Sequence, residues 1–164
     1  MEHILILVYR YNIDMIDFKE EQFADVIDDI KPLLEKHWEE VALDKEVIKL
    51  NPDYDMYKKL CALELMRIIT ARADGQLVGY CIVTVKHHLH YKDSLTAVND
   101  IFFIDPAHRE GSTGIKLFKS VEAILKGYGV QRLVMNTKTH RDVGVLFERM
   151  GYKETERVFT KLIG

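Results

Sequence analysis

Cysteine is scarce in this sequence, and so are the spacings that build disulfide or metal sites. The two cysteines, Cys61 and Cys81, belong to no CxxC pair and lie near no Cys/His ligand spacing. A free cysteine usually behaves as a small, buried apolar residue. The sequence therefore predicts two core thiols, no disulfide and no bound metal.

Excess positive charge and long apolar runs are also missing. The formal net charge is −3, and no run of lysine or arginine is long enough to attract nucleic acid or an anionic membrane. The longest uncharged stretch, Gln76 to Val85, is too short to span a bilayer, and Met1 to Asn12 lacks the basic leader and cleavage site of a signal peptide. We therefore expect a cytoplasmic protein that has neither nucleic acid nor membrane as a partner.

What is present is the composition of a folded domain. The 164 residues are 48% hydrophobic and 30% charged, which is a globular balance. This length supports one hydrophobic core and is short for two. We expect a single domain over residues 1–164.

The N-terminal third is expected to hold one strand followed by helices. Ile4 to Tyr9 is a short, β-rich apolar run, and Asp17 to Glu20 supplies an N-cap with an acid three residues later, which predicts a helix start. The apolar positions that follow share one helical stripe: Phe23, Val26, Ile27, Ile30, Leu33 and Leu34. Pro32 is expected to kink or split this helix, and Asn51-Pro52 is expected to start a second one.

The remainder of the chain predicts a mixed sheet. Asp74-Gly75 is a tight turn that joins Arg67 to Ala73 and Gln76 to Lys86 as an antiparallel hairpin. After a His-rich connection, the expected order is a strand at Leu95 to Ile104, a helix ending near Gly127, a strand at Gln131 to Asn136, a helix at Asp142 to Met150 and a closing strand at Tyr152 to Leu162. The strand–helix–strand unit from Val98 to Asn136 implies a parallel crossover.

A turn rich in small residues lies between the strand at Leu95 to Ile104 and the next helix. It reads Ile104-Asp-Pro-Ala-His-Arg-Glu-Gly-Ser-Thr-Gly114. Free N–H groups at a helix start and the positive end of the macrodipole hold phosphate oxygens, and Arg109 can add a charge-assisted hydrogen bond. A plain turn is the alternative. A Walker A loop and a dinucleotide fingerprint are disfavoured, because Gly-Lys-Ser/Thr and a third glycine are missing.

This turn resembles the pyrophosphate loop of the GNAT superfamily of N-acetyltransferases. That loop runs Pro-x-x-Arg-x-x-Gly-x-Gly/Ala after a strand, and Pro106, Arg109 and Gly114 match three of the four marked positions. Ser112 stands where the first glycine is usual, with Gly111 beside it. A second segment, from His140 through Phe147 to Tyr152, resembles the family's Asn-to-Tyr element and its glycine-containing turn.

The resemblance implies an α/β fold with a mixed, splayed sheet of about six to seven strands and helices on both faces. It also implies acetyl-CoA as co-substrate, without a metal. The pyrophosphate would lie on the amides of Glu110, Gly111, Ser112, Thr113 and Gly114. The pantetheine would run along Phe102, Phe103 and Ile104 like an added strand, with Phe147 near the cofactor. A backbone N–H near Ile104 would polarise the acetyl carbonyl.

The resemblance also suggests which residues carry the reaction. The family tyrosine that commonly acts as an acid corresponds to Phe147, which has no proton to give, and Tyr152 is expected in the core. A CoA thiolate leaves tolerably at neutral pH, so turnover does not require that acid. Asp100 is the first choice as general base, the alternative being a polar edge or an ion pair to another strand. His140 replaces the family asparagine and could act through water.

Two polar clusters are expected on the acceptor side. His87 to Tyr91 is interpreted as a solvated loop, with substrate contact second and a metal site third, because a fourth ligand is missing. His37 to Glu40 would line the acceptor groove or form a solvated helix end, and the solvated end is favoured.

The leading hypothesis is transfer of acetyl to a primary amine of a small molecule, peptide or protein by direct attack. The alternative is an acetyltransferase-like module that binds CoA or a partner protein without turnover, which Phe147 and Ser112 favour. A nucleotide-binding α/β domain ranks third. Family members often form homodimers through their C-terminal strands, so a homodimer is a further expectation, while the acceptor is not named by any motif.

Overall fold

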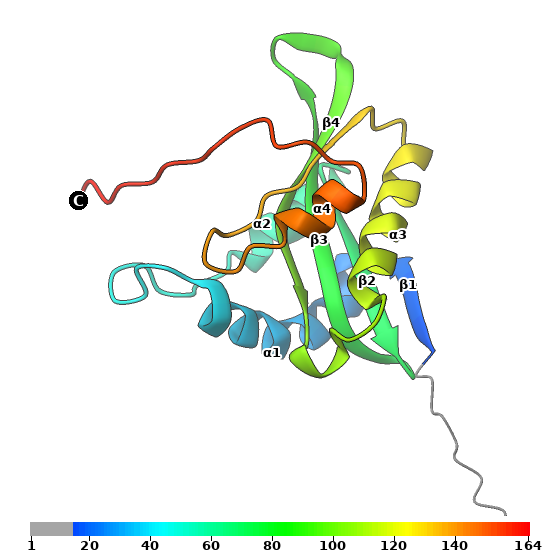
Figure 1. Ribbon diagram of the computed structural model, residues 1–164, viewed down its shortest axis with the longest axis vertical. Helices are drawn as coiled ribbons and strands as arrows, with labels where there is room; N and C mark the ends of the chain where they lie inside the picture. The colour runs from blue at the N-terminus through cyan, green and yellow to red at the C-terminus, as the bar shows by residue number, and fades with distance from the viewer. Residues whose placement is uncertain (1–14) are drawn as a thin grey trace, which may run out of the picture.

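The computed structural model describes residues 15–164 as one sheet with helices packed on both faces (Figure 1). In chain order the elements are β1 (Ile16–Glu20), α1 (Phe23–Val41), α2 (Tyr54–Ala62), β2 (Met66–Ala73), β3 (Gln76–His88), β4 (Tyr91–Ile104), a 3-10 turn η1 (Pro106–His108), α3 (Thr113–Gly127), β5 (Arg132–Val134) and α4 (Gly144–Arg149). The strand expected at residues 4–9 lies outside the described residues.

The strands of the sheet follow chain order from β1 to β5. β1 to β4 pair antiparallel, whereas β4 and β5 pair parallel across the α3 crossover. The turn between β2 and β3 is made by Asp74 and Gly75, whose φ angles of 48° and 83° are left-handed. The predicted mixed sheet is confirmed, and within residues 15–164 it has five strands, fewer than the six to seven expected for the whole chain.

Two apolar layers cover the sheet. On one face α1 buries Val26, Ile30, Leu33 and Leu34 at helical spacing, and α2 adds partly buried side chains. On the other face α3 buries Leu117, Val121 and Leu125. These layers hold the end of α1 and the start of α3 beside the carboxyl end of β4.

The N-terminal third departs from the sequence-based prediction in two places. Residues 17–20 belong to β1, which pairs with β2 from Ile16↔Ala73 to Glu20↔Ile69, so the helix start predicted there is wrong. Ile16 and Phe18 alternate with polar residues and pack on the core, and this period-two burial outweighs a capping pattern. The division predicted at Pro32 is also absent. α1 is one 19-residue helix, because its buried stripe continues on both sides of the exposed proline.

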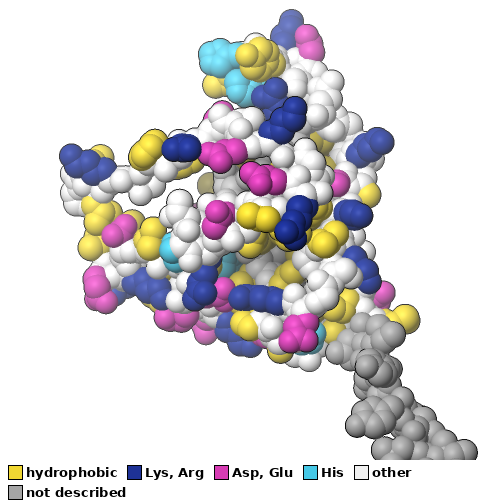
Figure 2. Space-filling model, in the orientation of Figure 1, with side chains coloured by type: hydrophobic (Ala, Val, Ile, Leu, Met, Phe, Trp, Pro, Cys, Tyr) yellow, Lys and Arg dark blue, Asp and Glu magenta, His cyan; other side chains and the backbone are white. Residues whose placement is uncertain are grey.

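The His-rich segment is strand rather than loop. His87 and His88 end β3 and Tyr91 begins β4, so that only Leu89 and His90 form the turn. The histidines and hydrophobic side chains at this tip are visible at the upper end of the molecule in Figure 2. Within residues 15–164, no group of three His, Cys, Asp or Glu side chains is arranged to hold a metal ion. The segment is solvated as predicted, but it extends the sheet.

The C-terminal segment does not close the sheet. Residues 152–162, predicted as a strand, form no ladder with any other segment of residues 15–164. The side chains of Val158 and Phe159 are 79% and 89% exposed, so the apolar alternation of this segment is not matched by a partner strand within the described part of the chain. None of the helices in residues 15–164 is both long enough and apolar enough to cross a membrane.

Candidate functional site

β4 and β5 separate after a short parallel ladder. They pair only from Thr96↔Arg132 to Val98↔Val134, whereas β4 continues to Ile104. At the point of separation, the buried side chain of Asn99 bonds the backbone of Asn136. Its Oδ1 accepts the Asn136 N–H, and its Nδ2 donates to the Asn136 carbonyl oxygen at 3.4 Å. The sheet is therefore splayed, and Asn99 fixes the residue at which the gap begins.

The edge of β4 that faces this gap carries backbone groups in a fixed direction. The Asp105 N–H donates to the Val78 carbonyl oxygen at 2.8 Å, and N–H directions alternate along a strand. The amide of Phe103 therefore points toward β3, while the amides of Phe102 and Ile104 point into the gap. An extended ligand can pair with these groups as an added strand would.

Asp100 is the extra residue of a β-bulge at the start of the gap. The register passes from Ile82↔Ile101 to Val83↔Asn99, so Asp100 has no opposite residue. Its carboxylate is exposed and accepts a hydrogen bond from the Tyr57 hydroxyl on α2, with 3.4 Å between Oη and Oδ2. Burial, helped by Asp100, raises the pKa of Tyr57 to about 12, so the phenol remains a donor.

The loop between β4 and α3 ends in a helix start without a side-chain cap. Gly111 has a φ of 70°, which glycine adopts without strain. Ser112 occupies the N-cap position of α3, yet its side chain makes no capping hydrogen bond. The N–H groups of the first turn, from Thr113 onward, and the positive end of the macrodipole can therefore receive an anion.

Arg109, in the same loop, is held by α1. Its Nη1 and Nη2 donate to the two carboxylate oxygens of Glu40 at 2.8 and 2.6 Å, and its Nε donates to the Ile104 carbonyl oxygen at 2.8 Å. The guanidinium also lies 5.2 Å from the centroid of the Phe103 ring. The hydrogen bonds from Arg109 keep the pKa of Glu40 below its ordinary value.

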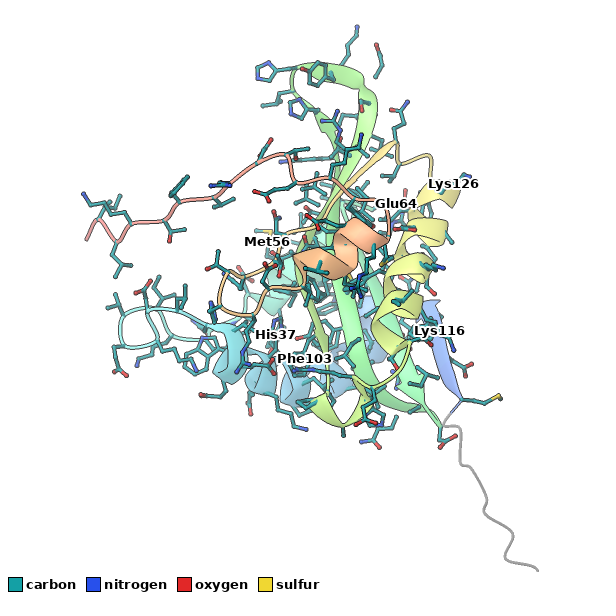
Figure 3. The ribbon with its side chains drawn as sticks, viewed as in Figure 1. His37, Met56, Glu64, Phe103, Lys116 and Lys126 are labelled. Atoms are coloured by element: carbon teal, nitrogen blue, oxygen red, sulfur yellow. The ribbon has the colours of Figure 1, made fainter. Side chains whose placement is uncertain are left out.

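His37 lies one turn before Glu40 and is buried. Its Nδ1 is 2.9 Å from the Tyr80 hydroxyl, and its ring stacks on Phe103 with 5.0 Å between centroids (Figure 3). Burial lowers the pKa of His37 to about 4, Glu40 opposes the shift, and Arg109 and Lys138 add to it. The imidazole is therefore neutral at physiological pH. The prediction of a solvated helix end is wrong for His37 and Glu40, whereas Glu39 is exposed.

Phe147 closes the gap from the α4 side. It is buried and makes edge-to-face contacts with Phe102 and Phe118, at centroid distances of 6.0 and 5.0 Å. Tyr152 packs on the Phe147 ring, and its hydroxyl donates to Glu122 at 2.7 Å, which fits the expected core role. His140 is exposed in the turn between β5 and α4, where the backbones of Lys138 and Arg141 form an isolated antiparallel β-bridge.

The structure thus gathers most of the sequence-predicted residues around one gap. Asp100, Phe102 and Ile104 lie on its β4 edge, and residues 110–114 lie at the start of α3. Sequence reasoning missed Tyr57, Tyr80 and the role of Glu40, because their partners are 43 to 69 positions away. For Glu40, a local signal was present: Glu39 and Glu40 lie in the last turn of α1 without a basic residue, which indicates that a cation comes from a distant segment.

The family comparison agrees with this geometry. Residues 64–154, more than half of the chain, match the model described as an acetyltransferase (GNAT) domain. No curated protein sequence matches the chain significantly.

Solved structures with the same fold are numerous. An aminoglycoside acetyltransferase from an uncultured soil metagenomic sample, in complex with sisomicin, has a TM-score of 0.70 at 15% identity, covering 91% of this chain and 97% of that one. Ribosomal-protein-alanine N-acetyltransferase from Brucella melitensis has a TM-score of 0.70 at 19% identity, covering 92% and 100%. A protein from Clostridium acetobutylicum named as a predicted acetyltransferase, solved with acetyl-CoA, has a TM-score of 0.67 at 10% identity, covering 90% and 96%. These structures share the fold, and because the family model covers more than half of the sequence, the chain belongs to the GNAT family of acetyltransferases.

Proposed function

We propose that this protein transfers an acetyl group from acetyl-CoA to a primary amine by direct attack. The observation that carries the proposal is the splayed gap, whose β4 edge offers strand-like backbone groups and ends at the uncapped start of α3. A thioester on an extended arm with a pyrophosphate at its far end requires these two features side by side.

The residues present fit acetyl-CoA at both ends of the gap. Backbone amides from Glu110 to Gly114 would receive the pyrophosphate, and the gap-facing groups of Phe102 and Ile104 would pair with the pantetheine. The Ile104 N–H, aimed into the gap, would stabilise negative charge on the acetyl oxygen. Phe103 packs in the core layer beneath α1, and Phe147 packs against Phe102 at the side of the gap, so both shape the site by packing.

Asp100 is our candidate for the general base. It sits on the bulge beside the gap, and its carboxylate is exposed and held by Tyr57. The amine nitrogen attacks the thioester carbonyl carbon, the carbon–sulfur bond breaks so that CoA leaves as its thiolate, and the ammonium proton passes to Asp100, directly or through water. His140, exposed in the opposite turn, is the second candidate and would act through water.

The decisive experiment is release of free CoA thiol from acetyl-CoA in the presence of an amine panel. The panel should include sisomicin and an alanine-containing peptide with a free amine, because one structural neighbour was solved in complex with sisomicin and another is named a ribosomal-protein-alanine N-acetyltransferase. Asp100→Asn should lower kcat at least tenfold, within the range for a general base. Asp93→Asn changes an exposed acid on the same strand and should leave kcat unchanged. Failure of the parent to bind acetyl-CoA would refute the proposal.

A CoA-binding module without turnover is the second candidate. It is favoured by Phe147, which offers no hydroxyl at the position where the family commonly has a tyrosine. Calorimetric binding of CoA by the parent, with no thiol release on any amine of the panel, would select this candidate.

We also propose that the protein self-associates through its C-terminal segment. Val158, Phe159 and Ile163 are between 79% and 93% exposed in an extended stretch. A second copy would cover this apolar strip, which a single chain leaves in water.

A further inference from the structure

Arg109 is committed to protein partners within the cofactor loop. A guanidinium carries five N–H donors, and three of them are already used, two by Glu40 and one by the Ile104 carbonyl oxygen. The bidentate pair is only partly accessible, with side-chain exposures of 38% for Arg109 and 19% for Glu40. The planar fork of arginine suits a carboxylate geometry that lysine cannot reproduce.

The pair joins two parts of the proposed site. Glu40 lies near the end of α1, on the acceptor side, and Arg109 lies between β4 and α3, in the loop proposed to bind pyrophosphate. A second ion pair runs parallel to it, from Lys36 to Asp105 at 2.7 Å. His37, between them, contacts Tyr80 and Phe103. One end of α1 is therefore fastened to the carboxyl end of β4 and to the loop that follows.

The hydrogen bond from Arg109 Nε also occupies the last backbone acceptor on the free edge of β4. The Ile104 carbonyl lies on the same edge as its amide, which faces the gap, and that carbonyl is occupied by Arg109. A pantetheine that pairs along this edge can use Phe102 and the Ile104 N–H, and it meets Arg109 beyond them.

Moving Arg109 onto a phosphate would be costly. Glu40 would lose both of its hydrogen bonds from Arg109, and a partly buried carboxylate would remain close to the incoming negative charge. Arg141, in the turn before α4, is near enough to lower the pKa of Glu40, but the hydrogen bonds to the Glu40 carboxylate come from Arg109.

We propose that Arg109 is a positioning residue that braces the acceptor-side helix α1 against the cofactor loop through Glu40, and that phosphate binding is left to the backbone amides of residues 110–114. This inference rests on the proposed function and reassigns one residue within it. The motif arginine then couples the two substrate sites without touching phosphate.

Four variants test the brace: Arg109→Gln, Arg109→Lys, Glu40→Gln and the reversed pair Glu40→Arg with Arg109→Glu. CoA affinity is measured by calorimetry, and hydrogen exchange is followed in residues 36–41 and 104–112. A brace predicts that each single variant, Arg109→Lys included, leaves the CoA Kd within about threefold and speeds exchange at the end of α1 about tenfold, as for lost hydrogen bonds to a charged group. The reversed pair should recover part of the protection and keep the CoA affinity.

A phosphate contact predicts the opposite pattern. Arg109→Gln would weaken CoA binding tenfold or more, Arg109→Lys would retain it, Glu40→Gln would not weaken it, and the reversed pair would abolish it. That result would overturn the inference. Failure of the parent to bind CoA would refute the proposed function but not the brace. The exchange data of the single variants and the reversed pair would still show whether Glu40 and Arg109 hold α1 in place. Equal exchange in parent and variants would refute the brace.

Discussion

Mild acid should destabilise this protein through His37. Burial lowers the pKa of the folded-state imidazole to about 4, from the ordinary value of 6.5. Glu40 opposes this shift, while Arg109 and Lys138 favour it, and Tyr80 is hydrogen bonded to the ring. No carboxylate forms a direct ion pair with His37 in the described structure, so the nearby Glu40 charge offsets only part of the cost of charging the buried ring.

The sign follows from which state binds the proton. Between pH 6.5 and 4 the unfolded chain protonates His37 and the folded chain does not, so the unfolded state gains free energy as the pH falls. The contribution of His37 is complete above pH 6.5 and is lost progressively toward pH 4. Carboxylates with lowered pKa values, such as Glu21, Glu40 and Asp105, start from ordinary values of 4.5 or below and lose their contributions at lower pH.

The size of the effect can be worked from the shift. Each pKa unit corresponds to about 1.4 kcal/mol, so lowering the pH from about 6.5 to 5 should remove about 2 kcal/mol of unfolding free energy. In a domain of this length that is a fall of about 4–8 °C in Tm.

The assay is urea or thermal unfolding at several pH values for the parent, His37→Gln and His90→Gln. Glutamine does not titrate, so His37→Gln should lose most of the slope between pH 5 and 6.5 even if its stability is lower at every pH. His90 is exposed at the hairpin tip and serves as the matched control, whose slope should equal the parent's. An unchanged slope in His37→Gln would refute the assignment.

Three further variants test the gap, the loop and the tail. Asn99→Ala leaves the Asn136 N–H unpaired, so it should lower the free energy of unfolding by about 1–3 kcal/mol and weaken CoA binding in calorimetry. Asn136→Ala keeps the bonded backbone groups and should change neither quantity. Gly111→Ala should lower the free energy of unfolding by about 1 kcal/mol, because Gly111 has a left-handed φ. Gly127 has no positive φ, and a Cβ added there would meet no atom within 4 Å, so Gly127→Ala should be neutral or stabilising in the same assay. Phe159→Asp should shift the protein toward monomer in light scattering, and a mass equal to the parent's would argue against self-association through that segment.

The central fold was predictable because its signals are local. The Asp74-Gly75 turn, the β-prone and almost continuously buried runs of β2 and β3 and the helical stripe of α3 each lie within about a dozen residues. The errors occurred where a local signal competed with a distant partner. Residues 17–20 look like a helix cap until the edge of β2 is available for pairing. Residues 152–162 have a strand-like pattern, but none of the strands described between residues 15 and 164 pairs with them.

The loop of the site was predictable for the same reason, whereas its wall was not. A turn and a helix start are predicted there by small residues close together in sequence, namely Gly111, Ser112 and Gly114. The bulge at Asp100 depends on the register with β3, and its contact with Tyr57 joins residues 43 positions apart. Nothing in a strand's own sequence specifies which of its residues is the unpaired one.

The end of α1 did carry a usable signal. Glu39 and Glu40 lie in its last turn, which has no basic residue, and negative charge at a helix C-terminus is unfavourable against the macrodipole. Two acids in that position imply cations supplied from elsewhere. The structure provides Lys45 for Glu39 at 3.0 Å and Arg109 for Glu40 at 2.6 Å. Because the pairing satisfies an electrostatic need of α1 itself, Arg109 is required at the helix whether or not a phosphate is bound. The wild-type helix end should therefore keep its protection from hydrogen exchange in both the CoA-free and the CoA-bound protein.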